Sequence, residues 1–260
     1  RTKKSLFHHL FPLNRAVLLH DGKQFLIEKY TIALSPGLRL VNPKPLAEIK
    51  LKALTAGLSE IPKNFTPDQN FPPLPYVQRE LEQIKKFGLS NQPLLNAQFT
   101  TKELRKQIAG ASVPPIVHLA THGRFSSKVK ETFILSWDKR IDVKQLSNLL
   151  RNTTLNQDTP IELLVLSACE TASGDERAAL GLAGVAVRAG ARSTLATLWS
   201  VVDESTAKIM GEFYHQLELA NANKLSKAEA LRQAQLILQK DAKYNHPHFW
   251  APFVMVGNWQ

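Results

Sequence analysis

The chain has 260 residues, 43% of them hydrophobic and 21% charged, and a formal net charge of +11. This balance excludes an intrinsically disordered chain, and the length is sufficient for a full hydrophobic core. The longest apolar runs fall far short of the roughly 18 residues that cross a bilayer, so we expect no membrane span and no membrane partner. The basic residues are scattered singly or in pairs, which indicates a solvated basic surface and argues against a nucleic-acid partner.

The chain contains one cysteine, Cys169. A single cysteine excludes an intrachain disulfide and fits a reducing compartment, so a cytoplasmic location is expected. The N-terminus lacks an initiator methionine and an apolar signal core, so we expect no secretory signal and interpret the chain as a piece of a longer protein.

The first elements are short. Between residues 17 and 40, apolar runs separated by turn residues predict strands, with a hairpin through Asp21-Gly22. Recurrent prolines between residues 41 and 75 predict loops, with a short helix near residues 46–54.

Two helices follow, and each has a sequence signal at one end. Apolar residues at helical spacing predict a helix over residues 76–87, which Gly88 ends. A second helix is predicted from Thr100 to about residue 110, because Thr100 and Glu103 form a capping-box pattern.

The second half of the chain alternates regularly between strands and helices. Its strands are continuously apolar, which is typical of a mostly parallel sheet covered by helices on both faces, that is, an α/β fold. Strands are predicted at residues 116–120, 161–166, 193–199 and 253–256, and helices at residues 143–150, 177–189, 204–219 and 226–238.

Two of these strands end in chemically reactive residues. One strand leads to His122 and Gly123, and the next leads to Cys169. Reactive groups collect at the carboxyl ends of parallel strands, and a thiol needs a nearby base such as histidine to form a thiolate at neutral pH. Gly123 lets the loop turn sharply, so its backbone N–H and that of Cys169 are candidate donors to an oxyanion.

Several motifs in this order resemble the CHAT family, whose members are related to caspases and separases. The motifs are His-Leu-Ala-Thr-His-Gly (118–123), Leu-Ser-Ala-Cys-Glu-Thr (166–171), the glycine-rich run 181–192, Leu-Trp-Ser-Val-Val-Asp (198–203) and Phe-Trp-Ala-Pro-Phe (249–253). The resemblance extends from about residue 17 to the end. It implies one caspase-like domain over residues 1–260, with a three-layer fold, an N-terminal part (1–111) and a catalytic core (112–260).

The resemblance also implies an activity. His122 and Cys169 match the catalytic dyad of a cysteine endopeptidase that cleaves a protein partner and needs no cofactor. CHAT domains often follow tetratricopeptide repeats in bacterial proteins, so a regulatory domain of that type is expected in the full-length chain. Two alternatives remain: a latent or non-proteolytic interaction module that keeps the fold, and a Cys169 that is only a small core residue.

His118 lies four residues before His122. On a strand this spacing separates the two by about 13 Å, and Leu119 stands where a helical zinc motif has glutamate, so we expect no metal site. His118 is predicted to be a hydrogen-bonded supporting residue beneath the catalytic loop.

Acidic residues near the dyad suggest a cleavage preference. The segment ending at Asp203 resembles the part of separase whose acid receives a basic side chain, so Asp203 is a candidate specificity residue. Glu170 and Asp175 add negative charge close to the nucleophile and favour the same preference. The alternative for Asp203 is an N-cap of a helix that begins at Glu204.

Overall fold

The computed structural model describes residues 20–35, 51–62, 65, 71–109, 114–125, 129–151, 161–167, 169–171, 190–223 and 225–260. For residues 125, 129, 151, 169–171 and 221–223 it describes the backbone alone. The predicted helix at 177–189 lies outside the described residues, as do the candidate Asp175 and part of the predicted proline-rich loop.

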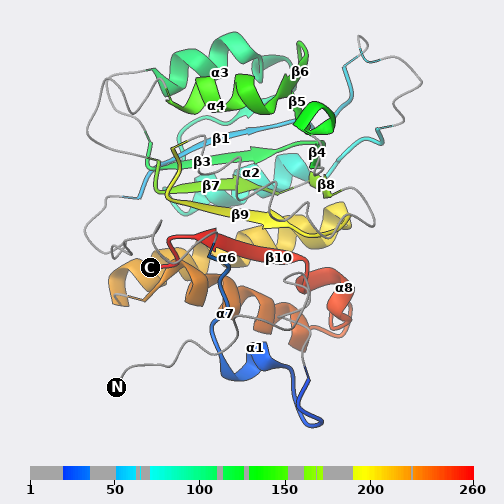
Figure 1. The fold of residues 1–260 in the computed structure, drawn as a ribbon, viewed down its shortest axis with the longest axis vertical. Helices are drawn as coiled ribbons and strands as arrows, with labels where there is room; N and C mark the ends of the chain where they lie inside the picture. The colour runs from blue at the N-terminus through cyan, green and yellow to red at the C-terminus, as the bar shows by residue number, and fades with distance from the viewer. Residues whose placement is uncertain are drawn as a thin grey trace.

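The fold is built on a six-stranded sheet with the order β10-β9-β7-β3-β1-β2. All neighbouring pairs are parallel except β10 with β9, which confirms the predicted mostly parallel sheet. The parallel strands therefore direct their carboxyl ends to the same side, on the right in Figure 1. The strands are β1 (Ala53–Gly57), β2 (Leu94–Leu95), β3 (Ile116–Ala120), β7 (Leu163–Leu166), β9 (Ser193–Thr197) and β10 (Phe253–Gly257).

Helices cover both faces of this sheet. Along β3, Ile116 and Ala120 belong to the core beneath α2, α6 and α7, whereas Val117 and Leu119 belong to the core beneath α3 and α4. This alternation follows from the two-residue period of a strand, and it gives the three layers that the sequence predicts. The helices are α2 (Val77–Lys86), α3 (Thr101–Ile108), α4 (Val143–Arg151), α6 (Asp203–Asn223) and α7 (Lys227–Lys240).

Local capping signals predicted the helix ends well. The Thr100 hydroxyl accepts a hydrogen bond from the Glu103 backbone N–H at 3.2 Å at the start of α3. Ser226 does the same for Glu229 at 3.1 Å at the start of α7. Gly88 follows α2 with a φ of 69°, the left-handed conformation that glycine adopts at low cost.

The N-terminal predictions need correction. A single antiparallel bridge between His20 and Phe25 closes the turn at Asp21-Gly22, but the chain then forms the helix α1 (Leu26–Lys29) where a strand was predicted. The helix predicted near 46–54 is wrong at its end, because Ala53 begins β1. Tertiary burial decides the second case: β1 is buried along its whole length, between β2 and β3, and its short apolar run has no periodicity of its own.

A second, four-stranded sheet has the order β6-β5-β4-β8, and its strands were not predicted. Three residues are too few to show a strand pattern in a sequence. Two of these strands follow directly from strands of the large sheet, since β4 comes after β3 and β8 comes after β7 (Figure 1). The strands are β4 (Gly123–Phe125), β5 (Phe133–Leu135), β6 (Arg140–Asp142) and β8 (Cys169–Thr171).

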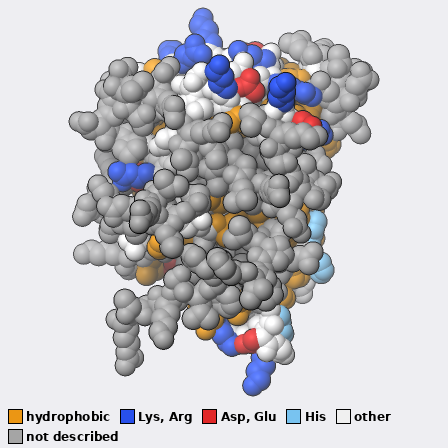
Figure 2. All heavy atoms as spheres, in the orientation of Figure 1, with side chains coloured by type: hydrophobic (Ala, Val, Ile, Leu, Met, Phe, Trp, Pro, Cys, Tyr) orange, Lys and Arg blue, Asp and Glu red, His pale blue; other side chains and the backbone are white. Residues whose placement is uncertain are grey.

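The remaining short helices are η4 (Asn96–Gln98), η5 (Val129–Glu131) and α8 (Pro247–Trp250). None of the described helices combines the length and the apolarity that crossing a membrane requires. Lysine and arginine side chains gather at the end of the molecule formed by α3, α4 and β6 (Figure 2). Exposed basic residues there are Lys102, Arg105, Lys106, Lys139, Arg140 and Lys144.

Candidate active site

His122 lies between the two sheets. It follows β3 by two residues and directly precedes β4, and 8% of its surface is exposed. Its backbone carbonyl accepts a hydrogen bond from the N–H of Leu135 at 2.8 Å. Because backbone groups of successive strand residues point to opposite edges, the N–H of Gly123 points toward β8.

Cys169 begins the strand beside it. In the parallel pair of β4 and β8, Gly123 is in register with Cys169. Neighbouring strands lie about 4.8 Å apart. Because His122 directly precedes Gly123, its backbone is close to that of Cys169 on the neighbouring strand. The folding of the chain thus brings together the two strand ends that the sequence singled out.

A segment before α2 holds the imidazole of His122. The backbone carbonyl oxygen of Pro72 lies 2.7 Å from Nε2 of His122, and the ring of Phe71 packs on the imidazole with its centroid at 5.1 Å. A carbonyl oxygen only accepts, so Nε2 carries the proton in this contact. In the neutral imidazole the basic nitrogen is then Nδ1.

His118 is fully buried among polar partners. Its Nε2 lies 2.8 Å from Oε1 of Glu80 in α2, and its Nδ1 lies 3.0 Å from the hydroxyl oxygen of Tyr214 in α6. The two groups are in close contact without forming a hydrogen bond. Burial and the charge of Glu80 raise the pKa of Tyr214 well above its usual value, so its hydroxyl keeps its proton.

Asp203 is the first residue of α6, which begins one residue earlier than predicted. Its Oδ2 accepts a hydrogen bond from the backbone N–H of Tyr76 at 2.8 Å, so the carboxylate binds the start of α2, and the predicted N-cap of a helix from Glu204 is wrong. Oδ1 is buried and has no hydrogen-bond partner within the described residues. Burial raises the pKa of Asp203, the Tyr76 N–H opposes this shift, and the charge of Glu80 adds to it.

Glu170 occupies β8 beside the nucleophile candidate, and its backbone is in register with Arg124 of β4. Asp175, the other acidic candidate, lies outside the described residues. Among the described residues, no group of three or more histidine, cysteine, aspartate and glutamate side chains is arranged to hold a metal ion.

Sequence reasoning missed two groups at this site. The Pro72 carbonyl is a backbone group, and no side-chain motif reports where a carbonyl will point. Glu80 had a signal that could have been used: it lies on the helix face of Val77, Leu81 and Ile84, all buried. A carboxylate on an apolar helix face requires a buried partner.

The family model described as the CHAT domain matches residues 7–258. The chain belongs to the CHAT family. Among curated proteins, this CHAT domain is 22% identical to tetratricopeptide repeat protein 28 of Mus musculus over 280 residues, and 21% identical to its Homo sapiens counterpart over 281 residues. These matches cover 91% and 92% of the chain, which spans only 11% of the length of either relative.

Solved structures show the same fold. The CHAT domain is similar to the crystal structure of the Arg-specific cysteine proteinase gingipain R, with a TM-score of 0.51 and 12% identity, over 86% of this chain and 50% of that one. It is similar to a complex of RgpB pro- and mature domains from Porphyromonas gingivalis, with a TM-score of 0.50 and 10% identity, over 89% of this chain and 51% of that one. The fold of the CHAT domain is therefore the three-layer caspase-like fold.

Proposed function

We propose that this CHAT domain is a cysteine endopeptidase that cleaves a protein substrate, with Cys169 as nucleophile and His122 as general base. The observation that carries the proposal is the register of β4 and β8, which pairs Gly123 with Cys169 directly after His122.

The contacts of His122 support the role of a base. The Pro72 carbonyl favours the tautomer with the proton on Nε2, which leaves Nδ1 to take the thiol proton. The thiolate of Cys169 then attacks the scissile carbonyl carbon, and the imidazolium returns its proton to the departing amine. Water hydrolyses the resulting thioester and releases the free enzyme.

The oxyanion of the tetrahedral intermediate is proposed to accept hydrogen bonds from the backbone N–H groups of Gly123 and Cys169. The N–H of Gly123 points toward β8, the strand that carries Cys169. The parallel pairing of Gly123 with Cys169 brings the backbones of these two residues side by side, which supports the proposal.

We further propose that the enzyme prefers a basic residue before the cleaved bond. Asp203 follows β9, the neighbour of β7, at the same edge of the sheet as Cys169, and its Oδ1 is a buried acceptor without a hydrogen-bond partner in the described part of the chain. Glu170 and Asp175 are proposed to add negative charge around the same subsite. Gingipain R is an Arg-specific enzyme of this fold, so the fold is compatible with such a preference.

One observation favours a second candidate, a latent form that acts as an interaction module until a partner binds. Phe71 and Pro72 contact His122, and only 8% of the surface of His122 is exposed. The relatives are tetratricopeptide repeat proteins, so we propose that such repeats form the regulatory domain of the full-length protein.

Cleavage of a peptide library tests the proposal. The chain is incubated with the library alone and as part of the full-length protein, and Cys169→Ala and His122→Ala serve as matched inactive variants. We expect the products of the wild type to disappear in both variants. If only the full-length protein cleaves, the domain is latent by itself; if neither cleaves, the peptidase assignment is wrong.

A further inference from the structure

The chain from β3 to His122 and the segment of residues 71–80, which runs into α2, are joined at two points. At one end, the Pro72 carbonyl and the Phe71 ring hold the imidazole of His122. At the other end, Glu80 contacts His118, four residues before His122. Residues 71–80 and residues 118–122 therefore form a closed ring of contacts at the carboxyl end of β3.

This ring is anchored on a third element, α6. The Tyr214 hydroxyl holds the second nitrogen of His118, and the Asp203 carboxylate holds the N–H of Tyr76 in the middle of the 71–80 segment. Three groups of that segment, at spacings of four residues, thus have fixed partners: the Pro72 carbonyl, the Tyr76 N–H and the Glu80 carboxylate.

The buried part of the ring has little freedom to rearrange. The side chains of Glu80, His118 and Tyr214 are all fully buried. A buried charge without its partner is costly, so the Glu80 to His118 contact resists separation. Packing is also tight: a Cβ added to Gly57 of β1 would lie 2.6 Å from Cγ1 of Val77, at the start of α2.

From this geometry we infer that Glu80 and Tyr214 are positioning residues for the proposed reaction. They fix His118 and α2 relative to each other, and this arrangement keeps the Pro72 carbonyl in contact with His122. The inference rests on the proposed function, since it assigns a purpose to the orientation of His122. Displacement of a catalytic group by about 1 Å can lower a rate by up to 100-fold, so a small shift of Pro72 is enough to matter.

Two measurements on the 260-residue chain test the inference. The first is the rate at which iodoacetamide alkylates Cys169 at pH 7, which is unambiguous because the chain has no other cysteine. The second is the pair of ¹⁵N chemical shifts of the His122 ring, which report its tautomer; His122→Gln assigns them among the eight histidines.

The variants are chosen to separate positioning from stability. Tyr214→Phe removes one hydroxyl, Glu80→Leu removes the carboxylate, and Glu80→Gln keeps its shape and an acceptor oxygen. Thr55→Val is the matched control, because Thr55 is in register with His118 on the next strand and its buried 2.7 Å hydrogen bond to Ser90 does not lead to His122.

We expect Tyr214→Phe and Glu80→Leu each to slow alkylation roughly tenfold and to shift the His122 ring toward a mixture of tautomers. Glu80→Gln should restore part of the rate, and Thr55→Val should match the wild type in both measurements. The inference is overturned if the Glu80 and Tyr214 variants behave like Thr55→Val. If Cys169 is alkylated as fast in His122→Ala as in the wild type, the proposed dyad is wrong. The ¹⁵N shifts of the His122 ring in the Glu80 and Tyr214 variants then decide by themselves whether these two residues position His122.

Discussion

At the scale of single residues, the two carboxylate oxygens of Asp203 have different surroundings. One oxygen anchors the start of α2 through Tyr76, and the other is buried without a hydrogen-bond partner within the described residues. Burial raises its pKa by more than the Tyr76 N–H lowers it, so the surroundings compensate a negative charge only in part. A basic substrate side chain would supply that compensation.

Asp203→Asn separates the anchoring of α2 from the proposed binding of a basic substrate side chain. Asparagine keeps an oxygen that accepts from Tyr76 but loses the charge, so kcat/KM for cleavage after arginine or lysine should fall roughly 30-fold or more. Cleavage after uncharged residues and the alkylation rate of Cys169 should stay as in the wild type. An equal loss for all peptides would show that Asp203 only anchors α2.

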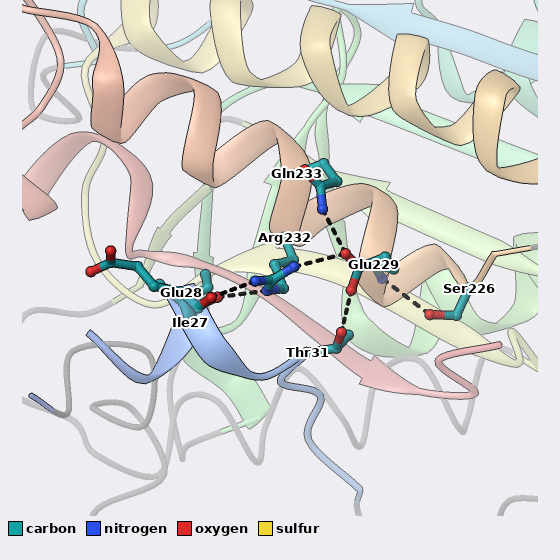
Figure 3. Close-up of polar contacts among 7 residues, drawn as sticks. All are labelled: Ile27, Glu28, Thr31, Ser226, Glu229, Arg232 and Gln233. Atoms are coloured by element: carbon teal, nitrogen blue, oxygen red, sulfur yellow. Dashed lines mark hydrogen bonds and ion pairs between the residues drawn. The ribbon is translucent and has the colours of Figure 1, made fainter. Parts of the chain in front are cut away.

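At the scale of elements, α1 illustrates how a very short helix is held. A four-residue helix has no stability of its own, and α1 depends on Arg232 of α7 (Figure 3). The guanidinium donates to the carbonyl oxygens of Ile27 at 2.6 Å and Glu28 at 2.7 Å. It also donates to Glu229 at 2.8 Å, so one side chain joins the end of α1 to α7.

Glu229 completes the same arrangement. It accepts hydrogen bonds from Thr31, Gln233 and Arg232 (Figure 3). Burial by itself would raise the pKa of Glu229, but these three donors outweigh burial and lower it. A lowered carboxyl pKa stabilises the fold above the unfolded-state pKa, and this stabilisation is lost as the pH falls through the folded-state pKa.

Arg232→Lys should release α1 while the rest of the fold persists. A lysine cannot reproduce the fork that reaches two carbonyl oxygens and a carboxylate, so we expect a loss of about 1–3 kcal/mol in the free energy of unfolding. Amide hydrogen exchange of residues 26–31 should accelerate. Gln233→Ala removes a contact to Glu229 without touching α1 and serves as the control; equal exchange in both variants would contradict the role of Arg232.

At the scale of the whole molecule, the two edges of the large sheet are used differently. The carboxyl edge carries the candidate site, and the amino edge carries a buried lysine. Lys227, the first residue of α7, is fully buried, and its Nζ has no hydrogen-bond partner among the described residues. Burial lowers the pKa of Lys227 from 10.5 to about 8, with Glu162 opposing the shift and Arg192 adding to it.

Lys227 should therefore reduce stability at neutral pH. Between pH 8 and 10.5 the unfolded chain binds the lysine proton while the folded chain does not, so this lysine makes stability rise with pH in that window. We expect Lys227→Met to raise the free energy of unfolding at pH 7 by about 3 kcal/mol. Urea unfolding at pH 7 and pH 9.5 measures this, and a gap between variant and wild type that does not narrow at pH 9.5 would refute it.

Much of the architecture could be predicted from the sequence because it depends on interactions between residues that are close in the chain. The cap pairs Thr100 with Glu103 and Ser226 with Glu229 act within three residues, and the predicted helices there are confirmed. The continuous apolar strands likewise predicted a parallel sheet covered on both faces, and the ordered motifs around His122 and Cys169 predicted the family.

Only the tertiary structure decided the surroundings of His122. The groups that surround it come from distant parts of the chain. Pro72 lies 50 residues from His122 in the sequence. Glu80 and Tyr214 lie 38 and 96 residues from His118, which they contact. Three-residue strands such as β4 and β8 exist because they pair with each other. The sequence by itself determined which residues stand at the strand ends, and packing determined what holds them, because long-range contacts leave no local pattern.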